Sequence, residues 1–182
     1  MMPGTPRPAA LIMLLGLMTG GTLPADDSAL DRPEVMRVVS LAQWERVLEA
    51  KQPGIIVADL WASWCVSCIE RFPKMVDLAD RFSQRNVTFL TLNLDDPQDA
   101  SGIEWSNGFL AGLGGTFGHY RLDENLTVAF EALDLMSLPV VLIHDGSGKE
   151  RHRLTNDNPN QQFTEADIEA ALEALLAGAE AP

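Results

Sequence analysis

Hydrophobic and polar residues follow two different periods along the chain, and the change of period separates predicted strands from predicted helices. Apolar runs over residues 55–61, 86–94 and 140–144 predict buried strands, and the alternation in residues 35–39 predicts an edge strand. Between these runs, apolar residues recur on one helical face, so helices are expected to cover a sheet. The predicted helices span residues 41–51, 66–82, 103–113 and 124–133, and a last one begins after Thr164.

Proline and turn residues mark two departures from this regular pattern. Pro73 falls inside the helix predicted for residues 66–82, where it removes a backbone donor and is expected to kink the helix. Residues 145–148 predict a turn after the strand at 140–144, and the polar residues 149–154 complete a hairpin. Because the second strand of this hairpin is charged, it is expected at an edge of the sheet.

A long segment separates the second and third buried strands. About forty residues lie between Asp95 and Pro139, which is too long for a plain loop in a compact domain. Besides the two helices predicted there, residues 117–122 predict a short strand. We therefore expect an inserted helix-strand-helix unit at about residues 98–136.

The N-terminal residues have the pattern of a secretory signal. Arg7 precedes an apolar run at residues 9–18, and small residues then lead to Ala25, just before two aspartates. We expect export with cleavage after Ala25. The alternative is an uncleaved membrane anchor, although the run is shorter than the roughly 20 residues of a spanning helix. The expected segments are a signal peptide at 1–25, a lead-in at 26–34 and one domain at 35–182.

Length and charge narrow the class of protein. A chain of 182 residues is long enough for one well-packed domain, and no repeat or low-complexity tract suggests a second. The formal net charge is −13 and the sequence has no cluster of lysines or arginines. Since phosphate binding needs a basic face, a nucleic-acid partner is not expected.

The chain contains two cysteines, Cys65 and Cys68, with two residues between them. They follow the predicted strand at 55–61, and residues i and i+3 share a face of a helix, so the spacing suits a reversible disulfide. Cys65 is then expected at the helix N-terminus, where free N–H groups and the helix dipole favour the thiolate that attacks disulfides. We therefore predict that Cys65 is the attacking thiol and Cys68 the resolving one.

One acidic residue, Asp59, interrupts the apolar run at residues 55–61. A carboxyl group in an apolar site has a raised pKa and can exchange a proton with a neighbouring thiol, so Asp59 is a candidate catalytic residue. The simpler interpretation is a buried acid that only makes local hydrogen bonds.

These residues resemble the active-site pattern of the thioredoxin superfamily. The match comprises Asp59, Trp61, Trp64, Cys65, Cys68 and Pro73. Leu138 and Pro139, followed by an apolar strand, look like the cis-proline loop of that family, although trans is the general default for such bonds. The resemblance implies an α/β, thioredoxin-like three-layer fold, in which helices flank a central mixed β-sheet. It also implies that Trp64, Leu138 and Pro139 line a groove where a partner's extended peptide docks.

The inserted unit resembles the TlpA/ResA-like branch of the superfamily, whose members are exported, often membrane-tethered thiol reductases. This resemblance implies protein disulfide substrates, a membrane-embedded thiol reductant as partner, a periplasmic or other extracytoplasmic location, and cytochrome c biogenesis as one candidate process. Asp59 departs from the branch, which commonly has asparagine there. Val66, Ser67 and Thr91 depart from thioredoxin itself, which has Gly-Pro between its cysteines and a strand lysine where Thr91 stands.

Other functions could use the same two thiols. An exported protein can keep a permanent disulfide, but closing so short a loop removes little unfolded-state entropy. Half a zinc site, Cu(I) delivery and a binding module without turnover are further alternatives, and no histidine or methionine closely flanks the cysteines. We expect a monomer with no cofactor and no metal.

The expected direction of exchange is reduction of other proteins' disulfides, with a disulfide oxidant as the alternative. A stabilised reduced form makes an exchange protein oxidising, and Val66 and Ser67 offer no basic side chain that stabilises the Cys65 thiolate. Asp59 acts in the same direction, because a negative or proton-holding group nearby disfavours the thiolate.

Overall fold

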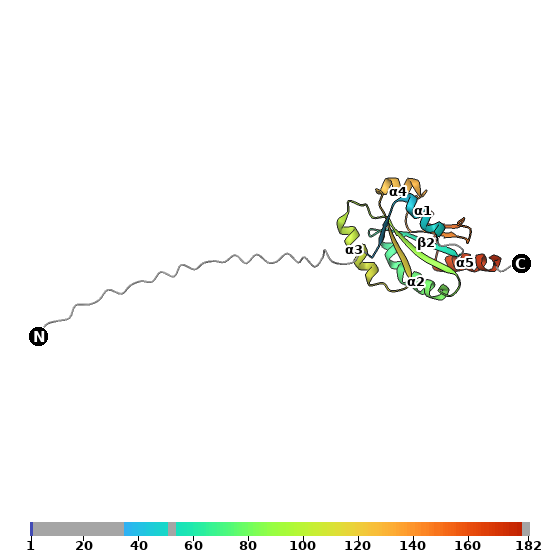
Figure 1. Ribbon diagram of the computed structural model, residues 1–182, viewed down its shortest axis with the longest axis horizontal. Coiled ribbons are helices and arrows are strands. Elements are labelled where there is room, and N and C mark those ends of the chain that lie inside the picture. Colours follow the sequence, from blue (N-terminus) through green and yellow to red (C-terminus); the bar gives the residue numbers. More distant parts are fainter. Residues whose placement is uncertain (2–34, 51–53, 180–182) are drawn as a thin grey trace. The chain divides into compact units, whose positions relative to one another are not determined.

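The computed structural model describes Met1, residues 35–50 and residues 54–179 (Figure 1). The predicted signal peptide after Met1 and the predicted lead-in lie outside the described residues. From Val35 onwards the described residues belong to one compact unit. Its elements are β1 (Arg37–Val39), α1 (Leu41–Ala50), β2 (Ile55–Trp61), α2 (Val66–Phe82), β3 (Val87–Asn93), α3 (Ala100–Ala111), β4 (Phe117–Leu122), α4 (Leu126–Ala132), β5 (Val140–His144), β6 (Glu150–Thr155) and α5 (Glu165–Ala179).

The strands of this unit form one mixed sheet in the order β1-β4-β3-β2-β5-β6. The strands β1, β4, β3 and β2 run parallel, whereas β5 pairs antiparallel with β2 and with β6. Both strands predicted at an edge, β1 and β6, lie there. The strand of the inserted segment, β4, lies inside the sheet between β1 and β3, so the segment contributes to the core rather than forming an appendage.

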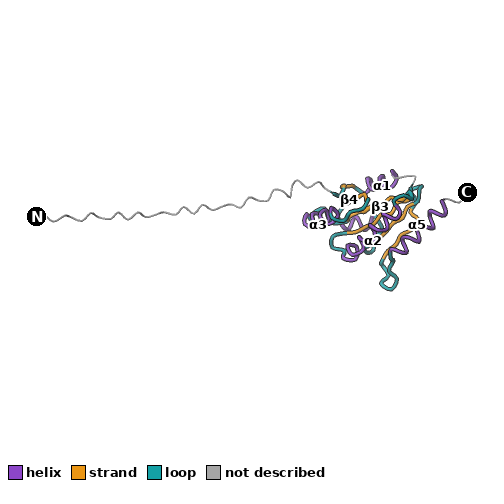
Figure 2. The backbone as a smooth tube through the Cα atoms, turned by 90° about the horizontal axis from the view of Figure 1, so that it is seen from below, coloured by secondary structure: helices purple, strands orange, loops and turns teal. Residues whose placement is uncertain are grey.

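Helices cover both faces of the sheet, and Figure 2 shows the strands between them. Side chains of β2 alternate, so Ile56, Ala58 and Leu60 pack with α1 and α4, whereas Ile55 and Val57 pack with α2 and α5. Figure 1 shows the same arrangement, with α1 and α4 above the sheet and α2 and α5 below it. The predicted three-layer α/β fold with a mixed sheet is therefore confirmed.

Capping explains where the helices of the inserted segment begin. The helix α3 begins at Ala100, before the predicted start, because the Asp99 side chain accepts a hydrogen bond from the Gly102 N–H (3.0 Å). In the same way, Asn125 caps α4 by accepting from the Val128 N–H (3.1 Å). The helix α2 continues through Pro73 as one element. Local capping thus moves the helix boundaries without changing the predicted order of elements.

Candidate active site

Cys65 and Cys68 lie where β2 passes into α2, and they are joined by a disulfide bond. In the turn after β2, the Cys65 N–H donates to the Ala62 carbonyl (3.0 Å), and Cys65 is the N-cap residue of α2. The backbone N–H of Cys68 donates both to the Cys65 carbonyl (3.1 Å) and to the Cys65 sulfur (3.3 Å), so an N–H of the first turn faces that sulfur. Cys65 is 6% exposed and Cys68 is fully buried, so Cys65 is the more exposed residue of the pair.

A buried carboxylate, Asp95, fixes the turn in front of Cys65. Its Oδ1 accepts from both the backbone N–H and the hydroxyl of Ser63, each at 2.8 Å. Its Oδ2 accepts from the Ser106 hydroxyl on α3 (2.6 Å) and from the Asn93 amide at the end of β3 (2.8 Å). The inserted helix therefore helps to hold the segment that precedes the disulfide. From the sequence, Asp95 marked only the end of a strand.

Aromatic side chains pack against the two cysteines on one side. The rings of Trp61 and Phe72 lie 4.9 Å apart, and Phe72 lies 5.2 Å from Phe109 on α3. Both cysteines pack in the same apolar cluster as Trp61 and Phe72. The inserted segment thus supplies part of the apolar surroundings of the disulfide, where electrostatic interactions are stronger than in water.

The residues predicted to line a substrate groove lie in different environments. Leu138 packs against the apolar cluster that contains the cysteines, and its bond to the buried Pro139 is cis. Trp64, next to Cys65 in the chain, is 51% exposed, and Met136, two residues before Leu138, is 82% exposed. Exposed apolar side chains therefore neighbour both segments along the chain, and their part in substrate binding stays a prediction.

Asp59 is buried, as predicted, but its carboxylate is not unpaired, because it forms an ion pair with Arg71. Nη2 of Arg71 on α2 donates a hydrogen bond to Asp59 Oδ1. Arg71 is itself only 7% exposed, and its guanidinium stacks over the Phe163 ring with 4.8 Å to the centroid. The sequence did carry a signal for this residue, since Arg71 follows Cys68 by three positions and so shares its helical face.

The charge of Asp59 is set by opposing effects. Burial raises the pKa of Asp59 to about 6, while the positive charge of Arg71 lowers it and the negative charge of Glu165 raises it. The carboxyl group is therefore mostly ionised at pH 7 and can accept a proton. Within the described part of the chain, Asp59 Oδ2 has no hydrogen-bond partner, so this oxygen is the one available for a proton.

The strand next to Asp59 supplies no cation. Thr91 on β3 pairs in register with Asp59, and His119 on β4 pairs in register with Thr91. The Thr91 hydroxyl and His119 Nδ1 form a hydrogen bond of 3.0 Å, and burial lowers the pKa of His119, which is therefore neutral at pH 7. Thr91, which stands at the position of the thioredoxin lysine, is thus uncharged. The positive charge next to Asp59 comes from Arg71 on α2 instead.

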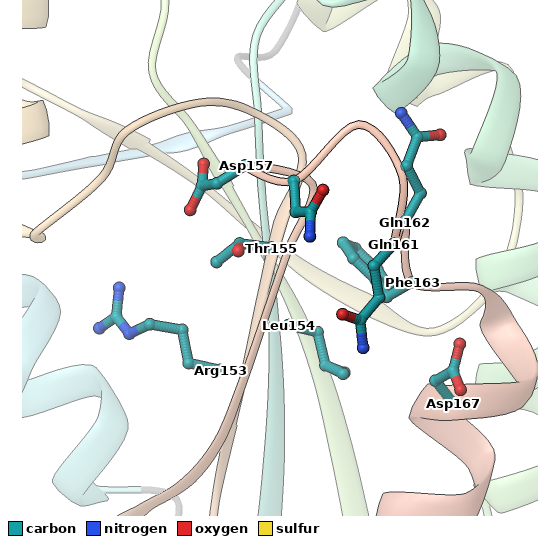
Figure 3. Close-up of a pocket in the computed structure, with 9 residues that line it drawn as sticks. Arg153, Leu154, Thr155, Asp157, Gln161, Gln162, Phe163 and Asp167 are labelled. Carbon is teal, nitrogen blue, oxygen red and sulfur yellow. The ribbon is translucent and has the colours of Figure 1, made fainter.

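The surface has a pocket near the C-terminal helix α5 (Figure 3). Its lining comes from the end of β6 and the loop that leads to α5, with Asp167 in the first turn of α5. Phe163, which lines this pocket, also stacks on Arg71. The pocket therefore adjoins the buried ion pair through one aromatic ring, but its lining contains neither cysteine.

Over residues 35–50 and 54–179, no group of three or more His, Cys, Asp or Glu side chains is placed to hold a metal ion. The histidines His119, His144 and His152 lie on three separate strands. In the same described ranges, no helix is both long and apolar enough to cross a bilayer.

Residues 35–104 match the thioredoxin family model. The chain is 29% identical over 127 residues to the thiol:disulfide interchange protein DsbE homolog of Paracoccus denitrificans (strain Pd 1222), an alignment that covers 70% of this chain and 65% of that protein. It therefore spans slightly less than two thirds of the length of this relative. A second relative, the thiol:disulfide interchange protein DsbE of Pasteurella multocida (strain Pm70), is 26% identical over 159 residues, which cover 83% of this chain and 82% of that protein.

A solved structure resembles the described unit as well. The crystal structure of a Chlorobium tepidum protein assigned as a thiol:disulfide interchange protein DsbE aligns with a TM-score of 0.55 at 23% identity. The alignment covers 71% of this chain and 83% of that one. At this identity the likeness concerns the fold alone.

Proposed function

Because this chain belongs to the thioredoxin superfamily of thiol:disulfide oxidoreductases, we propose that it is an exported, DsbE-like interchange protein that reduces protein disulfides. The observation that carries the proposal is the Cys65–Cys68 disulfide at the N-terminus of α2. A disulfide that closes so short a loop stabilises the folded state little, so it is better suited to reversible oxidation and reduction. The buried Asp59 behind it supports proton transfer during exchange.

The proposed reaction passes two electrons from the dithiol to a partner's disulfide. The Cys65 thiolate attacks one sulfur of the partner, so a mixed disulfide forms and the first partner thiolate leaves. Cys68 then gives its proton to Asp59 and attacks the Cys65 sulfur. The Cys65–Cys68 bond forms, the bond to the partner breaks, and the second partner thiolate leaves and takes up a proton. The 6% exposure of Cys65 and the full burial of Cys68 support this order.

Neutral surroundings of Cys65 support the reducing direction. The residues between the cysteines are Val66 and Ser67, and the Ser67 hydroxyl lies 3.7 Å from the Cys65 sulfur. The positive charge of Arg71 is engaged by Asp59. Without strong stabilisation of the reduced form, an exchange protein is a reductant rather than an oxidant. Outside the cytoplasm, such a reductant has no direct access to cytosolic electron donors, so we propose that a membrane-embedded thiol reductant regenerates it.

Export is proposed from the pattern of residues 1–25, with cleavage after Ala25. Protein recovered from the cell envelope should therefore have the intact mass of a chain that begins at Asp26. The variant Ala25→Leu, which places a bulky residue at the cleavage site, should retain the segment and serves as the control. An unmodified protein that keeps Met1 to Ala25 would make the segment an anchor, and a protein found only in the cytosol would contradict export.

A further inference from the structure

Arg71 is a charged residue on the buried face of α2, one helical turn beyond Cys68. Charged side chains are seldom buried without a partner, and a buried ion pair is often no more stabilising than apolar residues of the same size. The presence of this cation in the core therefore calls for an explanation other than stability. Its position one helical turn after Cys68 and its ion pair with the buried Asp59 point to a part in thiol exchange.

We propose that Arg71 is a positioning residue for Asp59, which it holds in the ionised form by binding Oδ1 and leaving Oδ2 available for the proton of Cys68. This inference rests on the proposed thiol exchange and concerns its second step, the attack of Cys68 on the mixed disulfide. In that step the S–H bond of Cys68 breaks and an O–H bond forms on Asp59.

The contacts of both side chains support this division of roles. Arg71 Nη2 donates to Asp59 Oδ1, whereas Oδ2 is buried and has no hydrogen-bond partner among the described residues. Nε and Nη1 of Arg71 likewise have no hydrogen-bond partner in the described chain, and the face of the guanidinium lies 4.8 Å from the Phe163 ring centroid. The carboxylate and the ring thus hold the guanidinium from two sides. Cys68 and Arg71 share a helical face, and Arg71 binds the Asp59 carboxylate from that face.

The charges around Asp59 give the effect of Arg71 a definite sign. Glu165 on α5 raises the pKa of Asp59, although Lys74 on α2 lies 3.3 Å from the Glu165 carboxylate. On the neighbouring strands, Thr91 and the neutral His119 contribute no charge. Burial raises the pKa of Asp59 to about 6 even with Arg71 in place. Without this cation the carboxyl group should be protonated at pH 7 and unable to accept the proton of Cys68.

Two measurements on the full chain test this inference, the first on its Cys65–Cys68 disulfide form and the second on a mixed disulfide. The first is the titration of the Asp59 carboxyl carbon by NMR, and the second is the pH dependence of the resolving step on a preformed mixed disulfide. The wild-type midpoint should lie near pH 6, and in Arg71→Met it should rise by at least about one pH unit. A midpoint near pH 7 would leave about half of the carboxyl groups ionised at pH 7, and one near pH 8 about a tenth, so the resolving step should be about twofold to tenfold slower there and recover by about pH 9.

Matched variants separate this effect from damage to the fold. Arg71→Lys keeps the positive charge and should restore most of the rate. Arg81→Met removes another α2 arginine, which forms an exposed ion pair with Glu169, and it should leave the Asp59 midpoint unchanged. A midpoint that stays near the wild-type value in Arg71→Met would overturn the inference.

A double variant keeps the inference testable if Arg71→Met alone does not fold. Asp59→Asn/Arg71→Met leaves no unpaired buried charge, and it should resolve the mixed disulfide within about twofold of Asp59→Asn alone. A further loss of tenfold or more would give Arg71 a role independent of Asp59 and contradict the inference. A wild-type protein without any exchange activity would instead refute the proposed function, and the carboxyl titration would still report on Arg71.

Discussion

Replacing Cys68 by serine should trap mixed disulfides with substrate proteins, whereas replacing Cys65 should abolish exchange. Cys65 caps α2 and is 6% exposed, so it can reach a partner, while Cys68 is fully buried and can attack only after the mixed disulfide has formed. Without its nucleophile, the Cys65→Ser variant should lose at least about a thousandfold in rate. Non-reducing electrophoresis of the native compartment, followed by mass spectrometry of the trapped adducts, measures the difference and identifies the partners.

The controls for this experiment come from the same turn. The double variant Cys65→Ser/Cys68→Ser should trap no protein, because it has no thiol left. Trapped adducts of Cys68→Ser should disappear on treatment with dithiothreitol. If Cys65→Ser accumulates adducts and Cys68→Ser does not, the order of attack is the reverse of the one argued here.

The variant Asp59→Asn should slow the resolving step about a hundredfold at pH 7, which is within the usual range for the loss of a general base. The pKa of Asp59 is raised to about 6, so the base is ionised above that pH and lost as the pH falls through it. The wild-type rate should therefore rise through about pH 6, and this rise should be absent in Asp59→Asn. Stopped-flow measurement of resolution between pH 5 and pH 9 shows both effects.

The loss in Asp59→Asn should shrink at high pH, because Cys68 ionises unaided as the pH approaches the usual thiol pKa of about 8.5. Asp77→Asn makes the same change on the exposed side of α2 and should behave as the wild type. An unchanged pH profile in Asp59→Asn would leave Asp59 with only a local hydrogen-bonding role.

The order and type of the elements follow from local patterns, and for this reason they could be predicted from the sequence. The all-apolar run of β2 and the helical spacing that buries Trp44 are both features of a short stretch of chain. The place of β4 between β1 and β3 depends on pairing between residues far apart in sequence, which periodicity does not encode. The start of α3 depends on the side chain of Asp99, a capping signal that the sequence did contain.

The same distinction holds for the active site. Cys65, Cys68 and Asp59 stand out because they interrupt or follow an apolar strand, so each could be identified from its neighbours in the chain. The partners of these residues could not, since Arg71 meets Asp59 only when α2 packs on the sheet. Likewise, Asp95 meets Ser63 across 32 positions of sequence. The candidate catalytic residues could thus be identified from the sequence, whereas the side chains that contact them are visible only in the structure.

The reduction potential of the Cys65–Cys68 couple tests the central claim most directly. The protein is equilibrated with glutathione and dithiothreitol buffers of known potential, and its thiols are then alkylated and counted by mass. A reductant of the proposed kind should lie nearer to the thioredoxin value of about −270 mV than to the value of about −120 mV for a strong oxidant. A potential above about −150 mV, or native protein that is wholly oxidised and oxidises unfolded substrates, would make the protein a disulfide donor and contradict the account.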